Sequence, residues 1–321
     1  MKRRDFVLAL GGAVAAPCAW GADAYPSRPI RWLVGFAVGG ASDILVRLVA
    51  EAMQKELGAT LVVENRPGAS GNIAAIALKQ APPDGYTILH GENSVLYINE
   101  HLGKIPYNPE RDFSYIGAIG RSSFTLVVHP SFPAHTLAEF IAYAKANPGR
   151  INYGSPGNGS PQRIAMESFQ KEWGVELTHV GYKGGAPALQ DVRAGQIQAM
   201  MTEVSISLPY LRDGGLRGLA ICASQRLAAL PAIPTFAELG YGSVSAFALH
   251  GVVGPAGLPR PIIERLNGAI NLALQSPRVV SHLSTNGIQP IPGTPEDFER
   301  TVRLERARTG EIIKAVGITA E

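Results

Sequence analysis

The sequence predicts an α/β fold of two domains, and three observations lead to that class. Strand-like and helix-like segments alternate along almost the whole chain, a pattern typical of mainly parallel sheets flanked by helices. Glycine-rich loops separate several of the strands from the helices that follow them. The length of 321 residues exceeds what a single hydrophobic core usually holds, so a division into two domains is expected.

The N-terminus has the order of a secretory signal peptide. Lys2, Arg3 and Arg4 are basic, an apolar run extends from Phe6 to Ala16, and small residues follow up to Ala24. The apolar run is too short to cross a bilayer. We therefore expect residues 1–24 to be a signal peptide, cleaved near residue 24, and the mature protein to be periplasmic. The paired arginines leave both the general and the twin-arginine export routes open, and a buried N-terminal helix is the structural alternative.

Charge and motif content exclude several classes of protein. Removing residues 1–24 from the 29 basic and 26 acidic residues leaves a net charge of about +2, which predicts no nucleic-acid or membrane-surface partner. Cys222 is the one cysteine after residue 24, so no internal disulfide can form. Dinucleotide and phosphate-loop fingerprints are absent and the seven histidines are scattered; neither a cofactor nor a metal is expected.

The first half of the chain predicts three strands and two helices in alternation. Strands are expected at 29–34, 60–64 and 86–89, and helices at 43–57 and at about 72–80. In the first helix Leu45, Leu48, Val49 and Met53 form one apolar stripe, and Gly58 ends it. Residues 82–85, Pro-Pro-Asp-Gly, form the turn into the third strand.

The second half repeats this order. Strands are expected at 125–128, 151–154, 177–180, 197–201 and 216–223, with helices at 136–146, 161–173 and 186–194. The chain then passes through the strand-like residues 247–253, and three helical patterns begin near Pro261, Pro277 and Pro295. Each half contains a strand, a glycine-rich loop and a helix, which indicates two similar lobes.

Four loops lie between a strand and a helix start, at residues 35–43, 65–72, 154–162 and 181–187. Glycine amides and helix N-termini favour anions such as carboxylates. Loops at the carboxyl ends of parallel strands lie at one edge of a sheet, and two lobes can close on one ligand there. A binding function follows, although a tight turn explains the first loop equally well and Ser160 also suits a helix N-cap.

Two other functional classes are compared with this one. No common hydrolase, metalloprotease or thiol-redox motif is present, but a spatial catalytic triad is invisible in a sequence, so a periplasmic enzyme acting on a small organic acid is the alternative. The ligand-sensing half of a transcriptional regulator would need a helix-turn-helix, which residues 1–24 do not supply.

In its loops the chain resembles the substrate-binding receptors of tripartite tricarboxylate transporters, also called the Bordetella uptake gene (Bug) family. One matching stretch is Gly39-Gly40-Ala41-Ser42-Asp43, and the others follow in the family's order across almost the whole mature chain. They are residues 29–43, 63–72, 83–87, 153–162, 182–188, 230–235 and 254–259.

This resemblance implies a type II periplasmic binding protein of the "Venus flytrap" class. Lobe one would comprise residues 25–126 and 247–321, and lobe two residues 127–246. It further implies a non-enzymatic receptor for a small di- or tricarboxylate or aromatic acid, taken up by a tripartite tricarboxylate-type transporter. We expect a monomer.

By position, the resemblance also implies a set of ligand-binding residues. Those in lobe one are Phe36, Val38, Gly39, Gly40, Ala41, Ser42, Asp43 and Ser94, the last from a loop near residues 91–94 that the resemblance places at the ligand. Those in lobe two are Ser155, Asn158, Ser160, Lys183, Gly184, Ala186 and Thr202.

Two departures from the family pattern bear on the pocket. Gly35 and Ala37 replace prolines of many relatives, which predicts a looser wall. Thr202 replaces an acidic residue that meets an ammonium group in some relatives. This favours a carboxylate without an amino group, although Glu203 offers an acid next to it.

Overall fold

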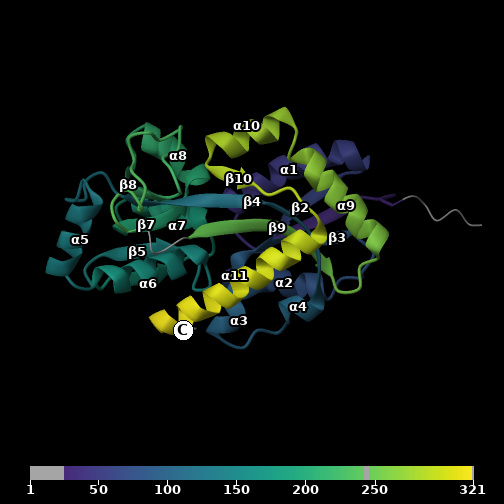
Figure 1. The fold of residues 1–321 in the computed structure, drawn as a ribbon, viewed down its shortest axis with the longest axis horizontal. Helices are drawn as coiled ribbons and strands as arrows, with labels where there is room; N and C mark the ends of the chain where they lie inside the picture. Colours follow the sequence, from purple (N-terminus) through teal and green to yellow (C-terminus); the bar gives the residue numbers. More distant parts are fainter. Residues whose placement is uncertain (1–24, 242–245, 320–321) are drawn as a thin grey trace, which may run out of the picture.

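Two lobes lie side by side along the long axis of the molecule (Figure 1). The computed structural model describes residues 25–241 and 246–319, so the predicted signal peptide lies outside the described residues. Strands β4 (Phe113–Val128) and β9 (Phe247–Pro255) run between the lobes. The α/β class predicted from the sequence is confirmed.

Lobe one is built on three parallel strands. β1 (Ile30–Val34) lies between β2 (Leu61–Asn65) and β3 (Thr87–Glu92), and β9, β4 and β10 (Ile288–Pro290) extend the sheet with antiparallel pairing. Its main core contains Trp32, Val49 and Met53. The helices that pack around this sheet are α1 (Ala41–Leu57), α2 (Asn72–Lys79), α9 (Arg260–Ala273) and α10 (Pro277–Thr285).

Lobe two repeats the arrangement. β5 (Asn152–Ser155) lies between β6 (Thr178–Gly181) and β7 (Ala199–Glu203) in parallel, and β4 joins β7 and β8 (Arg217–Cys222) in antiparallel pairs. The core includes Phe169, stacked on Phe236 with ring centroids 4.4 Å apart. The surrounding helices are α5 (Leu137–Ala146), α6 (Pro161–Trp173), α7 (Gly185–Arg193) and α8 (Val204–Arg212).

The connection between the lobes changes sheet within β4. Residues up to Ser123 pair with β9 in lobe one, whereas residues from Phe124 pair with β7 and β8 in lobe two. Two adjacent crossing strands are the arrangement expected of a hinge, because few backbone angles must change for the lobes to separate. The predicted lobe boundaries at residues 126 and 247 stay a prediction.

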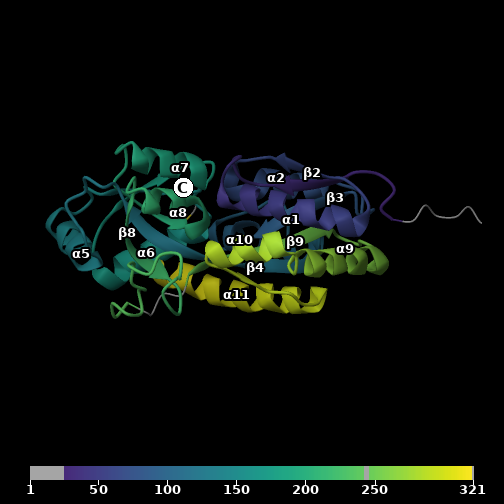
Figure 2. The ribbon, with the colours of Figure 1, turned by 90° about the horizontal axis from the view of Figure 1, so that it is seen from above.

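The C-terminal helix α11 (Pro295–Val316) lies along the outside of both crossing strands and reaches α6 of lobe two (Figure 2). A capping box between Thr294 and Asp297 starts this helix. Its side chain Phe298 is buried against Gly251 of β9, where an added Cβ would lie 2.1 Å from the ring. Gly251 therefore allows α11 to approach the sheet closely.

Replacing Gly251 by alanine is expected to destabilise the protein by roughly 1–3 kcal/mol, because the new methyl group overpacks a filled core. Urea unfolding would measure the loss. The double variant Gly251→Ala/Phe298→Leu should recover part of it, since leucine vacates the ring position. An unchanged unfolding midpoint for Gly251→Ala would contradict this account of how α11 docks.

Several elements differ from the sequence-based expectation. Strand β4 begins at Phe113, twelve residues before the predicted strand at 125–128, because glycines and serines masked its alternation. Helix α8 was not predicted, and Pro209 lies inside it. Short helical turns occur at two further places. The turn η1 (Ala69–Gly71) precedes α2, and η2 (Ser94–Ile98), α3 (Asn99–Leu102) and α4 (Pro109–Asp112) follow β3.

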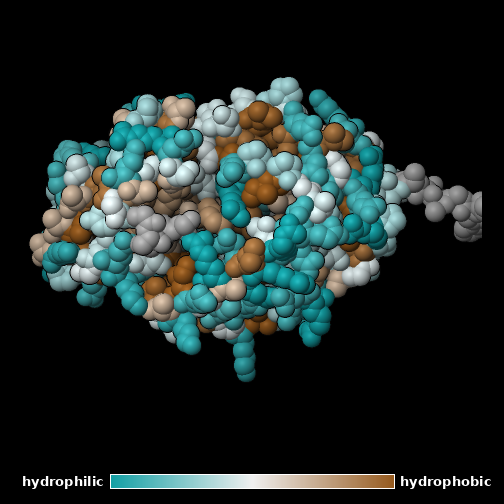
Figure 3. All heavy atoms as spheres, in the orientation of Figure 1, coloured by the Kyte–Doolittle hydropathy of each residue, from teal (hydrophilic) through white to brown (hydrophobic). Residues whose placement is uncertain are grey.

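The surface in Figure 3 is mainly hydrophilic, with hydrophobic residues in small separate groups on the face shown. In the part of the chain that the structure describes, none of the helices combines the length and the apolar character needed to span a bilayer.

Candidate functional site

The first glycine-rich loop brings the N-terminus of α1 to the boundary between the lobes. Gly40 is the N-cap of α1 and supplies no side-chain cap, so the N–H groups of the first turn remain able to bind an anion. A Cβ on Gly35 would lie 2.7 Å from the Cα of Gly71. This glycine therefore packs two loops closely together, and the looser wall expected from the sequence stays a prediction.

Asp43 holds this loop in place. Its carboxylate accepts hydrogen bonds from the Gly39 N–H, Arg47 Nε and Asn65 Nδ2, each at 2.9 Å. Burial tends to raise the pKa of Asp43, but these donors hold it below its ordinary value. Asp43 thus shapes the loop and has its oxygens engaged within lobe one.

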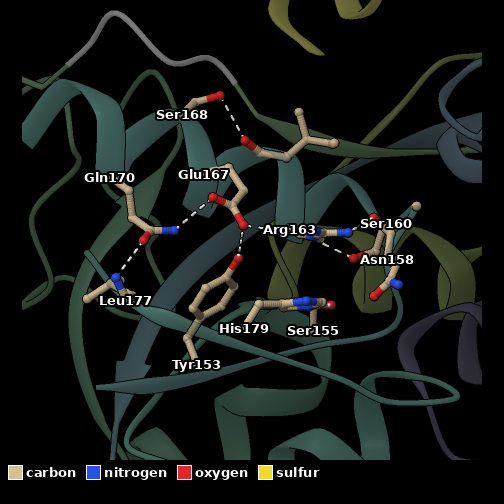
Figure 4. A network of polar contacts seen from close by, with 12 residues as sticks. Tyr153, Ser155, Asn158, Ser160, Arg163, Glu167, Ser168, Gln170, Leu177 and His179 are labelled. Carbon is tan, nitrogen blue, oxygen red and sulfur yellow. Dashed lines mark hydrogen bonds and ion pairs between the residues drawn. The ribbon is translucent and has the colours of Figure 1, made fainter. Parts of the chain in front are cut away.

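A buried polar network supports the glycine-rich loop of lobe two (Figure 4). Tyr153 on β5 donates from its hydroxyl to Glu167 Oε1 on α6 at 2.7 Å, and Arg163 Nε lies 3.7 Å from the same oxygen. Arg163 Nη1 also donates to the carbonyl of Asn158 at 3.5 Å. The first turn of α6 is thereby tied both to the sheet and to the loop.

Serines of the same loop are structural. The Ser155 hydroxyl lies 2.7 Å from His179 Nε2; burial and then the nearby Arg163 lower the pKa of His179 to about 4. Ser160 is the N-cap of α6 and accepts from the Arg163 N–H. Both side chains are engaged within lobe two.

The lobes are in contact across the cleft, and hydrogen bonds contribute to this closure. The Ala37 N–H donates to the Lys183 carbonyl at 3.3 Å, and the Gly159 N–H donates to Ser70 Oγ at 2.9 Å. Beneath these contacts lies an inner cavity of about 20 Å³, about the space of one water molecule. Its walls come from both lobes and comprise Phe36, Gly40, Ala41, Ser42, Glu92, Pro156, Gln162, Gly185, Met200, Thr202, Glu203 and Ile206.

The structure divides the predicted site residues into three groups. Five line the inner cavity: Phe36, Gly40, Ala41, Ser42 and Thr202. Asn158 and Lys183 line a second, outer cavity of about 220 Å³, which Phe36 also borders. The remaining eight line neither cavity: Val38, Gly39, Asp43, Ser94, Ser155, Ser160, Gly184 and Ala186.

The structure shows where four of these eight residues lie instead. Val38 is 66% exposed on the outer surface. Ser94 is fully buried beneath the cleft. Gly184 is the N-cap of α7, and a Cβ added to it would lie 3.0 Å from the Ala37 nitrogen. Ala186 does not line the inner cavity, but the preceding residue, Gly185, does.

The sequence-based prediction missed several cavity residues, above all two acids. Glu92 ends β3 and Glu203 ends β7, and both are buried, at 3% and 4% exposure. Glu203 had a signal as the neighbour of Thr202, and Gln162 belongs to a loop already noted. Glu92 lies in the loop near residues 91–94 that the family resemblance placed at the ligand, although only Ser94 was singled out there.

The two acids belong to a buried cluster at the hinge. His250 on β9 lies with its Nε2 3.1 Å from Glu203 Oε2 and 2.7 Å from Ser122 Oγ. Its Nδ1 lies 3.1 Å from Nε2 of His90. On the other side, Glu92 Oε2 accepts from Ser42 Oγ at 2.8 Å and lies 3.9 Å from His90 Nδ1.

Burial and neighbouring charges shift the pKa values of these groups. It raises the pKa of Glu92 to about 7, with the Glu203 charge adding to the effect. Burial alone would lower the pKa of His250, but the Glu203 carboxylate outweighs it and the pKa is raised. Burial, then His250, place the pKa of His90 well below its ordinary value. The cluster therefore favours a proton on His250, next to Glu203, over one on His90.

The donor atoms of His90, Glu92 and His250 lie within 4.8 Å of one another, the spacing at which a metal would be considered. Both nitrogens of His250 already face hydrogen-bond partners, as does Nε2 of His90. The arrangement thus functions as a hydrogen-bond network.

Two lobes, two crossing strands and a cavity closed from both sides define a periplasmic binding protein fold. Solved structures agree. The R. palustris protein Rpa4515, solved with adipate, superposes with a TM-score of 0.89 at 34% identity, covering 92% of this chain and 99% of that one. MatC from Rhodopseudomonas palustris, with bound malate, gives a TM-score of 0.86 at 30% identity over 90% of this chain and all of MatC.

The sequence comparisons identify the family. Residues 45–318 match the model of the tripartite tricarboxylate transporter family receptor. The protein BugT of Bordetella pertussis is 35% identical over 306 residues, which cover 95% of this chain and 93% of BugT. The chain belongs to this receptor family, and the resemblance inferred from its loops is confirmed.

Proposed function

We propose that the protein is an extracytoplasmic receptor that binds a small carboxylate between its lobes and delivers it to a tripartite tricarboxylate-type transporter. The observation that carries the ligand class is the open N-terminus of α1, where Gly40, Ala41 and Ser42 line the inner cavity without a side-chain cap. Relatives of the same fold hold adipate and malate, which supports a carboxylate here. Export with cleavage near residue 24 and action as a monomer complete the proposal.

The inner cavity is smaller than any dicarboxylate, so the lobes must separate for a ligand to enter. The lobes then close again on the bound ligand, with the inner cavity wider than in this structure. Each hydrogen bond from the protein to a carboxylate contributes about 1.5–3 kcal/mol, which offsets the ordering of the loops.

The geometry supports a receptor over an enzyme. Ser122, His250 and Glu203 have the composition of a catalytic triad, but the serine hydroxyl and the carboxylate contact the same nitrogen, Nε2. In a working triad the acid contacts the opposite nitrogen and so orients the base. Ser122 is also 1% exposed, which keeps its hydroxyl away from a substrate.

A thermal-shift screen of the exported, processed receptor tests the function. The panel is succinate, glutarate, adipate, malate, citrate, benzoate and the common amino acids, applied after unfolding and refolding to remove co-purified ligand. We expect one class of carboxylates to raise the melting temperature, with a stabilisation of about 2.7 kcal/mol at a hundredfold excess over the Kd. No shift with any carboxylate, or conversion of the bound acid to a product, would refute the proposal.

A further inference from the structure

The inner cavity places two acids beside the expected position of the ligand carboxylate. Glu92 reaches it from lobe one and Glu203 from lobe two, and neither lysine nor arginine is among the residues that line this cavity. The hydroxyl of Ser42, in the first turn of α1, donates to Glu92 Oε2 at 2.8 Å. An anion held at that helix start would therefore lie next to Glu92. Two neighbouring buried anions repel each other, so one positive charge or proton is needed.

His250 contacts Glu203 directly and Glu92 only at longer range. Glu203 Oε2 lies 3.1 Å from His250 Nε2, and the Glu203 carboxylate raises the pKa of His250. Glu92 faces Ser42 of α1, His90 of its own strand and Glu203 and His250 of the crossing region, with Tyr97 of η2 also near. Burial keeps both His90 and Tyr97 neutral, since it lowers the pKa of the first and raises that of the second.

We propose that Glu92 meets the ligand carboxylate as a neutral carboxylic acid, so that the receptor captures an anionic ligand together with one proton. The inference rests on the proposed function and adds a specificity-determining residue to it. One Glu92 oxygen accepts from Ser42, and the O–H on the other donates to the ligand. The proton comes from solvent, and no covalent bond of the ligand changes. A hydrogen bond from an acid to a carboxylate is short and strong because it is charge-assisted.

Two further polar atoms in the same cavity point to a ligand there. Oγ1 of Thr202 and Oε1 of Gln162 are buried and have no hydrogen-bond partner within residues 25–241 and 246–319. Both come from lobe two and both line the cavity. Unpaired buried polar atoms are costly, so their placement indicates a polar ligand group. The Thr202 hydroxyl supplies a donor from lobe two that complements the Glu92 acid from lobe one.

If Glu92 is protonated on binding, the protein takes up protons from solvent, and this uptake can be measured. The raised pKa of Glu92, about 7 in the ligand-free protein, rises further beside a second carboxylate. Binding then takes up protons at pH 7–8.5, where the free acids of the panel are already ionised. We expect uptake to approach one proton per ligand by pH 8.5. The affinity should fall by roughly tenfold for each pH unit above the pKa of Glu92 in the ligand-free protein.

Isothermal titration calorimetry of the exported receptor tests this with the tightest of succinate, glutarate, adipate and malate. Titrations at pH 6.5, 7.5 and 8.5, in buffers of different ionisation enthalpy, give both the affinity and the number of protons taken up. Glu92→Gln retains a neutral donor, so its affinity should be independent of pH and exceed that of the wild type at pH 8.5 by about tenfold or more. Glu92→Met removes both the donor and the charge, so its affinity should be independent of pH and lower than that of Glu92→Gln at each pH by about tenfold or more.

Two controls keep the test decisive. Glu172→Gln, at an exposed position of α6, should leave affinity and proton uptake as in the wild type. Thr202→Val removes a different donor from the cavity, so it should weaken binding while the pH dependence remains. This variant tests the role of Glu92 even if Glu92→Met fails to fold.

The outcomes separate this inference from the function on which it rests. Dicarboxylate binding without proton uptake, and with affinity independent of pH, would overturn the role of Glu92 and leave the receptor function intact. Proton release, with tighter binding at high pH and loss of affinity in Glu92→Gln, would mean that the ligand presents a cation to Glu92. That result also overturns the inference. Absence of binding by every carboxylate would overturn the proposed function as well.

Discussion

Replacing Gly159 by alanine is expected to weaken ligand binding roughly 10- to 100-fold, because the lobes can no longer close as they do in this structure. A Cβ at this position would lie 1.9 Å from Asn99 Oδ1 of lobe one. Asn99 cannot turn away easily, because its Nδ2 donates to the Ser70 carbonyl and to Asn72. The clash arises when the lobes close, and overpacking of this kind costs about 1–3 kcal/mol, which corresponds to the stated loss of affinity.

Calorimetry with the best ligand of the panel would measure the loss of affinity. Gly268→Ala is the matched control, since a Cβ at that position in α9 has no atom within 4 Å. The double variant Gly159→Ala/Asn99→Ala should recover part of the affinity. If Gly159→Ala bound as tightly as the wild type, the contact between this loop and α3 could not be part of the ligand-bound form.

The second prediction concerns the stability of the ligand-free protein and its dependence on pH. Burial raises the pKa of Glu92 above its unfolded value, to about 7. The folded state therefore binds more protons than the unfolded state between about pH 4.5 and 7. Stability falls as the pH rises through that window. Glu92→Gln removes the ionisable group, so it should raise the free energy of unfolding by up to about 3 kcal/mol at pH 8 and little at pH 5.

Urea unfolding of the wild type and of Glu92→Gln at pH 5, 6.5 and 8 would show the effect as a growing separation of the two midpoints. Glu172→Gln, exposed in lobe two, should follow the wild type throughout. A separation that is constant with pH, or one that grows towards pH 5, would show that Glu92 remains ionised in the folded protein.

Most elements of the fold follow from short-range patterns. The helix at Pro161–Trp173 was predicted with its residues unchanged, because Ser160, Pro161 and Gly174 mark both of its ends. The parallel strands β1, β2 and β5 were predicted to within one residue at each end. Strand β4 was not predicted over its full length, because it is defined by pairing with β9 and β10 across the sheet and not by an apolar pattern. Helix α8 was missed because Pro209 contradicts its local propensity.

The candidate site likewise has features that the local sequence predicts and features that it does not. Glycines and helix starts are local features, so the loop that carries Gly40, Ala41 and Ser42 could be located from the sequence. Loop residues look alike whether they face a ligand or support a neighbour, which is why Asp43 and Ser155 were included although their polar atoms are engaged within their own lobes. Glu92 was covered only by the range 91–94, and its role could not be predicted, since that role depends on residues of other elements.

The order of residues along this chain thus specified an α/β architecture, its glycine-rich loops and the family to which it belongs, because each depends on patterns within about ten residues. The cavity was decided by tertiary structure alone. Glu92 and Glu203 are more than a hundred residues apart in sequence, and they line one cavity because β3 and β7 end at the same cleft. The burial that raises the pKa of Glu92 exists only once both lobes have folded and met.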